Sequence, residues 1–262
     1  MMAMNHIIED WADQYVWIVG ASTGIGAATA RLLLEKGAHV ALSARRQQAL
    51  DDLAAADADA APRTLAVALD VTNHASVARA RDDILASWPR IDLVLLVAGG
   101  YNEMRADSFD LEQANQLIDL NLRGVFNCLA PVLPMLIGQG SGGVGIVSSV
   151  AGYSGLPKAL VYGPTKAALI NLAESLYFDL HPKGIGVYLI NPGFVDTPLT
   201  KGNDFPMPGL MRPADAAREL VRGVERGAFH IHFPRKFTNT LRFARLLPYR
   251  LYFWLIAKVT RL

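Results

Sequence analysis

Short apolar runs of strand length alternate along the chain with longer stretches whose apolar residues recur every three or four positions. The short runs occupy residues 15–20, 39–43, 64–69, 93–97, 144–148, 186–190 and 230–233. The longer stretches occupy residues 24–36, 46–56, 77–87, 111–136, 162–180 and 213–226. Runs that are apolar on both faces predict buried strands, and the three-to-four spacing predicts amphipathic helices.

Regular alternation of strands and helices predicts a parallel sheet built from right-handed crossovers. We therefore expect an α/β fold, a Rossmann-like doubly wound sheet of about seven strands with helices on both faces. The pattern favours one domain over residues 1–235, followed by a helical extension over residues 236–262. No internal repeat interrupts it.

The composition is consistent with an α/β domain and also indicates where in the cell the protein is found. The 262 residues are 52% hydrophobic and 19% charged, which is typical of a globular chain of one domain. The single cysteine, Cys128, excludes an internal disulfide and suits a reducing compartment. The acidic N-terminal residues predict no signal peptide. We expect a cytoplasmic protein.

A glycine-rich loop follows the first strand and opens the first helix. Its spacing is G-x-x-x-G-x-G, and its candidate cofactor-binding residues are Gly20, Ser22, Thr23, Gly24, Ile25 and Gly26. Glycines let the backbone turn sharply and approach a pyrophosphate, and the helix start offers free N–H groups. An ordinary strand-to-helix turn is the alternative interpretation.

The end of the second strand indicates which nicotinamide cofactor the loop would bind. An acid there would bind the ribose 2′-hydroxyl of NAD, but the chain has Ala44 followed by Arg45 and Arg46. A guanidinium suits bidentate binding of a 2′-phosphate, so we expect NADP(H) in preference to NAD(H). The alternative is that both arginines only decorate an exposed helix start. Thr23 weakens the NADP(H) prediction slightly, because it puts no second base in the loop.

Tyr162 and Lys166 carry the clearest catalytic pattern. Their i, i+4 spacing puts both side chains on one helix face. A neighbouring ammonium, together with an oxidised nicotinamide, would lower the pKa of the phenol and suit it to proton transfer. Ser149 lies thirteen residues earlier at a strand end, and Asn121 lies upstream in the long helical stretch.

Together these motifs resemble the short-chain dehydrogenase/reductase family, over residues 15 to 233. The resemblance implies that Tyr162 is the general acid and base, and that Ser149 orients the substrate. Asn121 would distort the long helix and hold a water that links Lys166 to solvent. Lys166 would also bind the nicotinamide ribose.

The resemblance also implies further cofactor contacts. Asp70 and Val71 would touch the adenine, Ala98 and Gly99 would lie under the adenosine ribose, and the segment after the sixth strand would meet the nicotinamide through Pro192, Gly193, Val195 and Thr197. One departure is Leu96, which stands where the family usually has an asparagine that ties the sheet together. We expect apolar packing to replace it.

Several other partners are not indicated. His230 and His232 share one strand face but lack an obvious third ligand, so we predict no metal site. The predicted domain carries no basic stripe with interleaved aromatics, which argues against nucleic-acid binding. The resemblance implies a homodimer or homotetramer formed through the helices at residues 111–136 and 162–180.

Two segments rich in apolar side chains indicate the kind of substrate and a second contact surface. Residues 198–212 predict a mobile lid, whose apolar content suggests an apolar substrate. Residues 236–262 mix aromatic and basic side chains. From Gly227 onward the chain has seven bases and no acid, so the first 226 residues carry +1 − 7 = −6.

Three interpretations of this tail compete. It lies in the interface of an anionic membrane, or packs on a partner subunit, or covers its own substrate cleft. The first two are compatible, and the first would bring the protein to the inner face of a membrane. The longest uncharged run of the tail, residues 251–257, is too short to span a bilayer.

These features predict an NADP(H)-dependent oxidoreductase that moves a hydride between the nicotinamide and a carbonyl or secondary alcohol carbon. The alternative is a catalytically silent NADP(H)-binding sensor or scaffold that docks through its tail. Epimerisation through a transient ketone is a third possibility, although the short C-terminal region leaves little room for a larger substrate domain.

Overall fold

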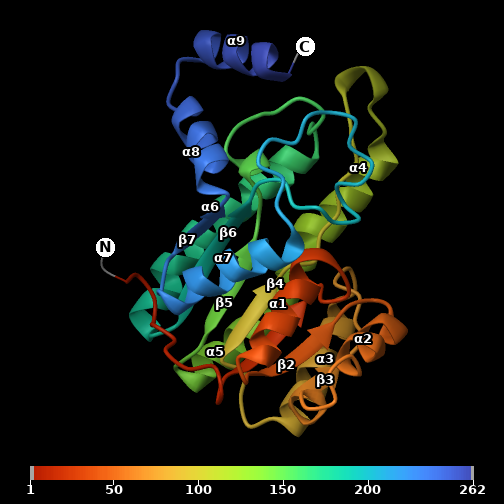
Figure 1. Ribbon diagram of the computed structural model, residues 1–262, viewed down its shortest axis with the longest axis vertical. Coiled ribbons are helices and arrows are strands. Elements are labelled where there is room, and N and C mark those ends of the chain that lie inside the picture. Colours follow the sequence, from red (N-terminus) through yellow and green to blue (C-terminus); the bar gives the residue numbers. More distant parts are fainter. Residues whose placement is uncertain (1–2, 261–262) are drawn as a thin grey trace.

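The computed structural model describes residues 3–260 and shows, within them, one parallel sheet of seven strands (Figure 1). The strand order is β3-β2-β1-β4-β5-β6-β7. The first three strands are added in one direction and the last four in the other, so the two halves of the sheet meet between β1 and β4. The strands are β1 (Tyr15–Val19), β2 (His39–Ser43), β3 (Thr64–Ala66), β4 (Leu93–Leu96), β5 (Gly143–Val147), β6 (Gly186–Pro192) and β7 (His230–Phe233). The predicted fold class is confirmed.

Helices cover both faces of the sheet. One face packs against α1 (Gly24–Glu35), α2 (Gln47–Ala54) and α7 (Pro213–Glu225). The other packs against α3 (His74–Ser87), α5 (Gly124–Gln139) and α6 (Tyr162–Leu180). The remaining helices are α4 (Leu111–Ile118), α8 (Arg235–Ala244) and α9 (Tyr249–Thr260).

Alternating side chains of the central strands build the two cores. In β1, Trp17 and Val19 enter one apolar cluster, while Val16 and Ile18 enter the other. Successive side chains of a strand point to opposite faces, so a strand that is covered on both sides must be apolar throughout. This is why the sequence shows continuous apolar runs here.

The long helical stretch is interrupted where the sequence predicted one helix over residues 111–136. A π-helical segment, Asp119–Arg123, joins α4 to α5 and contains the fully buried Asn121. Helix α5 runs on to Gln139 and ends at Gly140, whose φ of +67° is easy for glycine. By length and composition alone, residues 111–139 are long and apolar enough to cross a membrane, and 44% of their most apolar part is buried inside the protein.

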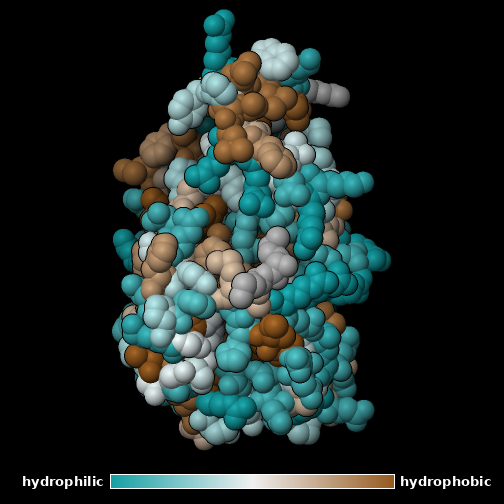
Figure 2. Space-filling view, turned by 90° about the vertical axis from the view of Figure 1, so that its left-hand side faces the viewer, coloured by the Kyte–Doolittle hydropathy of each residue, from teal (hydrophilic) through white to brown (hydrophobic). Residues whose placement is uncertain are grey.

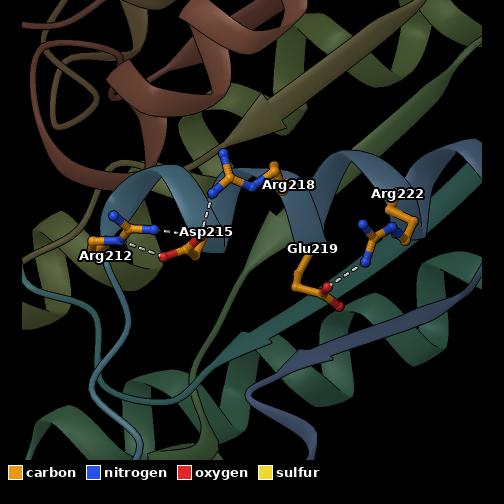
Figure 3. Close-up of polar contacts among 5 residues, drawn as sticks. All are labelled: Arg212, Asp215, Arg218, Glu219 and Arg222. Atoms are coloured by element: carbon orange, nitrogen blue, oxygen red, sulfur yellow. Dashed lines mark hydrogen bonds and ion pairs between the residues drawn. The ribbon is translucent and has the colours of Figure 1, made fainter.

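Helix α7 illustrates how the outer helices are anchored. Its apolar side chains are buried against the sheet and α1. Its polar side chains form ion pairs along the outer side (Figure 3), joining Asp215 to Arg212 and Arg218 and Glu219 to Arg222. Exposed pairs of this kind contribute little, so burial of the apolar side holds the helix in place.

The tail forms two helices that lie beyond the end of β7 (Figure 1). Helix α8 follows β7 directly, and α9 runs across the end of the molecule. Pro248 stands directly before α9, and its carbonyl accepts hydrogen bonds from the N–H groups of Leu251 and Tyr252 in the first turn of that helix. This arrangement places the tail beside the carboxyl ends of β5 and β6.

Candidate active site

A large cavity lies at the carboxyl ends of the strands. Its volume is about 1250 Å³, beyond the roughly 300–1,000 Å³ of a typical small-molecule pocket. Most of the predicted site residues line it: Gly20, Ser22, Thr23, Gly24, Ile25, Arg45, Arg46, Val71, Ala98, Gly99, Ser149, Tyr162, Lys166, Pro192, Gly193, Val195 and Thr197. Ligands of open α/β sheets bind at this edge.

The glycine loop between β1 and α1 leaves space only for backbone. Gly20 has a φ of +101°, and a Cβ there would lie 2.5 Å from the nitrogen of Ala98. A Cβ on Gly26 would lie 2.1 Å from the carbonyl oxygen of Gly20. Thr23 caps α1 without a side-chain hydrogen bond, so the first N–H groups of the helix are available to a phosphate. The loop therefore fits a dinucleotide pyrophosphate.

On the side of the cavity predicted to hold the adenosine, only some of the predicted residues line the cavity. Arg45 and Arg46 are exposed at its rim, where no described acid forms an ion pair with them. Val71 lines the cavity, but Asp70 does not. The carboxylate of Asp70 accepts hydrogen bonds from the N–H and hydroxyl of Thr72, at 2.9 and 2.8 Å, and so stabilises its own turn. Its predicted adenine contact stays a prediction.

Ser149, Tyr162 and Lys166 meet on one wall of the cavity. Ser149 caps a short turn, with its hydroxyl accepting from the N–H of Ala151 at 3.1 Å. Lys166 is 4% exposed and donates to the carbonyl of Val147 at 3.0 Å. Its Nζ lies 5.7 Å from the centre of the Tyr162 ring. The i, i+4 spacing thus places cation and phenol side by side.

Burial changes the acidity of both groups. It raises the pKa of the Tyr162 phenol, an effect that the hydroxyl of Ser149 opposes, and it lowers the pKa of Lys166 to about 8. The sequence predicted a lowered pKa for Tyr162 with the oxidised nicotinamide bound beside it, and that stays a prediction. In the protein alone burial raises this pKa, because removing the phenolate from water has a large free-energy cost. Burial therefore favours the neutral phenol of Tyr162.

Asn121 lies behind the wall and not in the cavity lining. Its carboxamide accepts from the N–H of Gly100 at 2.7 Å and donates to the Gly100 carbonyl at 2.9 Å. It also donates to the hydroxyl of Thr165 at 3.3 Å. The π-helical segment aims this side chain inward, and the two-way bond fixes the strand-end loop beside Lys166.

Two segments close the opposite side of the cavity. The predicted lid contributes Pro198, Leu199, Thr200, Asn203, Phe205, Pro206, Met207 and Pro208, whereas Leu210 is exposed. The tail contributes Phe237, Leu241, Ile256, Val259 and Thr260. The hydroxyl of Tyr252 donates to the carbonyl of Gly155 at 2.7 Å and ties α9 to the cavity wall. One face of the tail therefore covers its own cleft, as one of the three interpretations predicted.

A sequence model of the short chain dehydrogenase family matches residues 14–205, about three-quarters of the chain. The chain belongs to the short-chain dehydrogenase family. Members are oxidoreductases that bind a nicotinamide cofactor and small-molecule substrates, and they generally form oligomers. The family match ends before α7, β7 and the tail.

Individual relatives extend this finding. An uncharacterized oxidoreductase of Myxococcus xanthus (strain DK1622) is 36% identical over 235 residues, 88% of this chain and 91% of the relative. The cis-4-hydroxycyclohexanecarboxylate dehydrogenase of Sinomonas cyclohexanicum is 37% identical over 215 residues, 81% and 84% of the two chains. The crystal structure of a short-chain dehydrogenase from Streptomyces avermitilis has a TM-score of 0.80 and 28% identity, covering 95% of this chain and 98% of the other.

Tyr101 and Lys158 also line the cavity of this short-chain dehydrogenase, and sequence reasoning missed both. The ring of Tyr101 meets that of Tyr162 edge-on at 5.1 Å, and its hydroxyl donates to the carbonyl of Lys158 at 3.3 Å. The ammonium of Lys158 forms ion pairs with Glu103 and with Asp204 of the predicted lid. The position of Tyr101 just after β4 was an available signal, since strand-end loops line such sites.

Leu96 and the two histidines of β7 contact other side chains of the fold. Leu96 is buried in an apolar cluster of the core, so its side chain packs as expected from the sequence. His230 bonds Tyr153 and Asn191, and His232 bonds Thr238. Over residues 3–260, no three histidine, cysteine or acidic side chains are grouped to hold a metal ion.

Proposed function

We propose that the protein is an NADP(H)-dependent oxidoreductase that interconverts an apolar carbonyl compound and its secondary alcohol. The observation that carries the proposal is the shared cavity wall on which Ser149, Tyr162 and Lys166 lie beside a glycine loop shaped for a dinucleotide. The Sinomonas relative, named as a dehydrogenase of a hydroxylated cyclohexane, supports this reaction class.

The cofactor would be held along the carboxyl ends of the strands. The glycine loop and the start of α1 would bind the pyrophosphate, Arg45 and Arg46 the 2′-phosphate, and the Pro192–Thr197 segment the nicotinamide. A Cβ added to Gly24 would lie 2.9 Å from the methyl group of Thr197. The glycine loop and the Pro192–Thr197 segment are therefore direct neighbours. When bound, the nicotinamide supplies or accepts the hydride.

The side chains of the protein would handle the proton. In the reductive direction, Tyr162 donates its phenolic proton to the substrate oxygen as the carbonyl carbon gains the hydride. Ser149 holds that oxygen through its hydroxyl, and Lys166 stabilises the resulting phenolate through its ammonium. In the oxidative direction, the tyrosinate takes the alcohol proton back. Asn121 positions the loop next to Lys166.

Tyr162→Phe tests the proton-transfer role. We expect NADPH oxidation with a panel of apolar ketones to fall by about 100-fold or more, because the variant keeps the ring but has no proton to give. NADPH binding should persist. Tyr188→Phe is the matched control, since Tyr188 is buried but lies outside the cavity lining. Equal rates for Tyr162→Phe and the parent would remove the mechanism, and NADPH binding without turnover in the parent would favour the silent sensor.

Arg45→Ala tests the cofactor preference. We expect NADPH to raise the melting temperature of the parent more than NADH at equal concentration. Loss of one charge-assisted bond should weaken NADPH binding about 10-fold, or about 1.4 kcal/mol, and leave NADH binding unchanged. Arg31→Ala, an exposed change on α1 outside the cavity lining, is the control. A parent that binds NADH as tightly as NADPH would overturn the preference.

A further inference from the structure

The tail has a second face that covers nothing in the described chain. While Tyr252 and Ile256 are buried against the cavity wall, large apolar side chains on the other side of α8 and α9 are open to solvent. Hydrophobic side chains gather at this end of the molecule (Figure 2). We call the tail face the exposed set Phe243, Leu246, Tyr249, Leu251, Phe253 and Trp254, each at least 52% exposed.

The charge around the tail face has one sign. Arg245 and Arg250 are exposed on it, and no described acid forms an ion pair with either. The sequence has seven bases and no acid from Gly227 onward, against −6 for the preceding residues. Apolar and aromatic side chains flanked by bases are the composition that binds an anionic lipid interface.

A second copy of the chain fits this face less well. A two-fold contact sets the same surface against itself, so it would oppose base to base with no acid of the tail to compensate. A lipid headgroup layer supplies the missing negative charge. Helix α9 has 12 residues, about 18 Å in length, so it is too short to cross a bilayer but long enough to lie in its surface.

The tail face adjoins the mouth of the cavity. Val259 is 63% exposed and also lines the cavity, and Leu241 and Ile256 line it from the same two helices. We propose that α8 and α9 dock the protein on an anionic membrane surface and thereby open its cavity toward the lipid, from which an apolar carbonyl or alcohol substrate enters. The substrate part rests on the proposed function, and the docking part does not.

Vesicle binding by the full chain tests the docking. Trp254 is the natural probe, because it is 60% exposed whereas Trp11, Trp17 and Trp88 are at most 8% exposed. We expect its emission to shift to the blue with vesicles containing about one-third phosphatidylglycerol, and much less with phosphatidylcholine alone. Trp254→Phe should abolish the shift while the protein still floats with the vesicles.

Charge variants separate lipid binding from general stickiness. The double variant Arg245→Gln/Arg250→Gln should bind anionic vesicles about 30-fold more weakly, since each base near the surface contributes roughly fivefold. Arg31→Gln/Arg79→Gln removes two exposed bases from α1 and α3 and should bind like the parent. Binding that is absent, equal on both vesicles, or unaffected by the tail variant overturns the docking. So does a Trp254 emission that changes with protein concentration alone, which would show a second copy on this face.

Turnover tests the substrate route. A short water-soluble ketone and a long-chain ketone held in anionic vesicles are compared with NADPH. The Arg245→Gln/Arg250→Gln variant should slow the vesicle-held ketone about as much as it weakens binding, and leave the soluble ketone unchanged. Equal effects on both ketones overturn entry from lipid. If the parent reduces neither ketone, the proposed function and the route both fail, while the vesicle-binding result still stands.

Discussion

Lys166 gives the most quantitative prediction, because burial alone sets its acidity. Its pKa falls from 10.5 to about 8 in the folded protein, since only 4% of the residue reaches solvent. Between these two values the unfolded chain binds a proton that the folded protein does not, so stability rises with pH. The full difference corresponds to about 3.4 kcal/mol, at about 1.36 kcal/mol for each pH unit. Between about pH 7 and about pH 9.5 the expected gain is about 2 kcal/mol.

Urea unfolding at these two pH values measures the gain, with Lys166→Met as the comparison. Methionine fills a similar volume without a charge, and the other titrating groups, including the buried tyrosines, are the same in both proteins. The free energy of unfolding of the parent should therefore rise by about 2 kcal/mol more than that of the variant. Lys201→Met removes an exposed lysine and should behave like the parent. Parallel responses of the parent and Lys166→Met would refute the argument.

Two further predictions concern the glycine loop and the working pH. Gly26→Ala should lose about 1–3 kcal/mol of stability and most of the NADPH-induced rise in melting temperature, because its Cβ would meet the Gly20 carbonyl. Gly138→Ala has open space in α5 and should stabilise the protein by about 0.5–1 kcal/mol; equal effects of the two changes in thermal melting would contradict this account. The rate of ketone reduction should decline as pH rises through about 8, where Lys166 loses its proton while Tyr162 keeps its own. A rate that keeps rising to about pH 9.5 would count against a catalytic ammonium.

The elements that the sequence predicted well are those fixed by local pattern. The helix over residues 162–180 and the strands over residues 39–43 and 230–233 have the predicted bounds. The edge strand β3 is shorter than predicted, ending at Ala66 instead of residue 69, where its last pair with β2 joins Ala66 to Leu42. The break in the long helix was expected from the resemblance and not from the periodicity, since a π-helical segment leaves the apolar spacing nearly unchanged.

The site residues also divide into those that a local sequence pattern reveals and those that only the assembled fold brings together. Tyr162, Lys166 and the glycine loop could be found from sequence, because one helical turn or one strand-to-helix turn brings their groups together. Tyr101 and Lys158 come from separate loops that meet only when the sheet is assembled. Their role in the cavity depends on contacts between residues 57 positions apart, which no local pattern encodes.

The sequence by itself determined a parallel sheet covered on both faces, a loop that admits a phosphate, and a phenol one helical turn from an ammonium. These properties follow from the period of apolar side chains and from backbone conformations that only glycine adopts easily. The tertiary structure decided how strongly each group is buried, and hence the direction of each pKa. It also decided that one side of the tail closes the cavity while the other stays exposed, because the two sides of a helix are distinguished only by what packs against them.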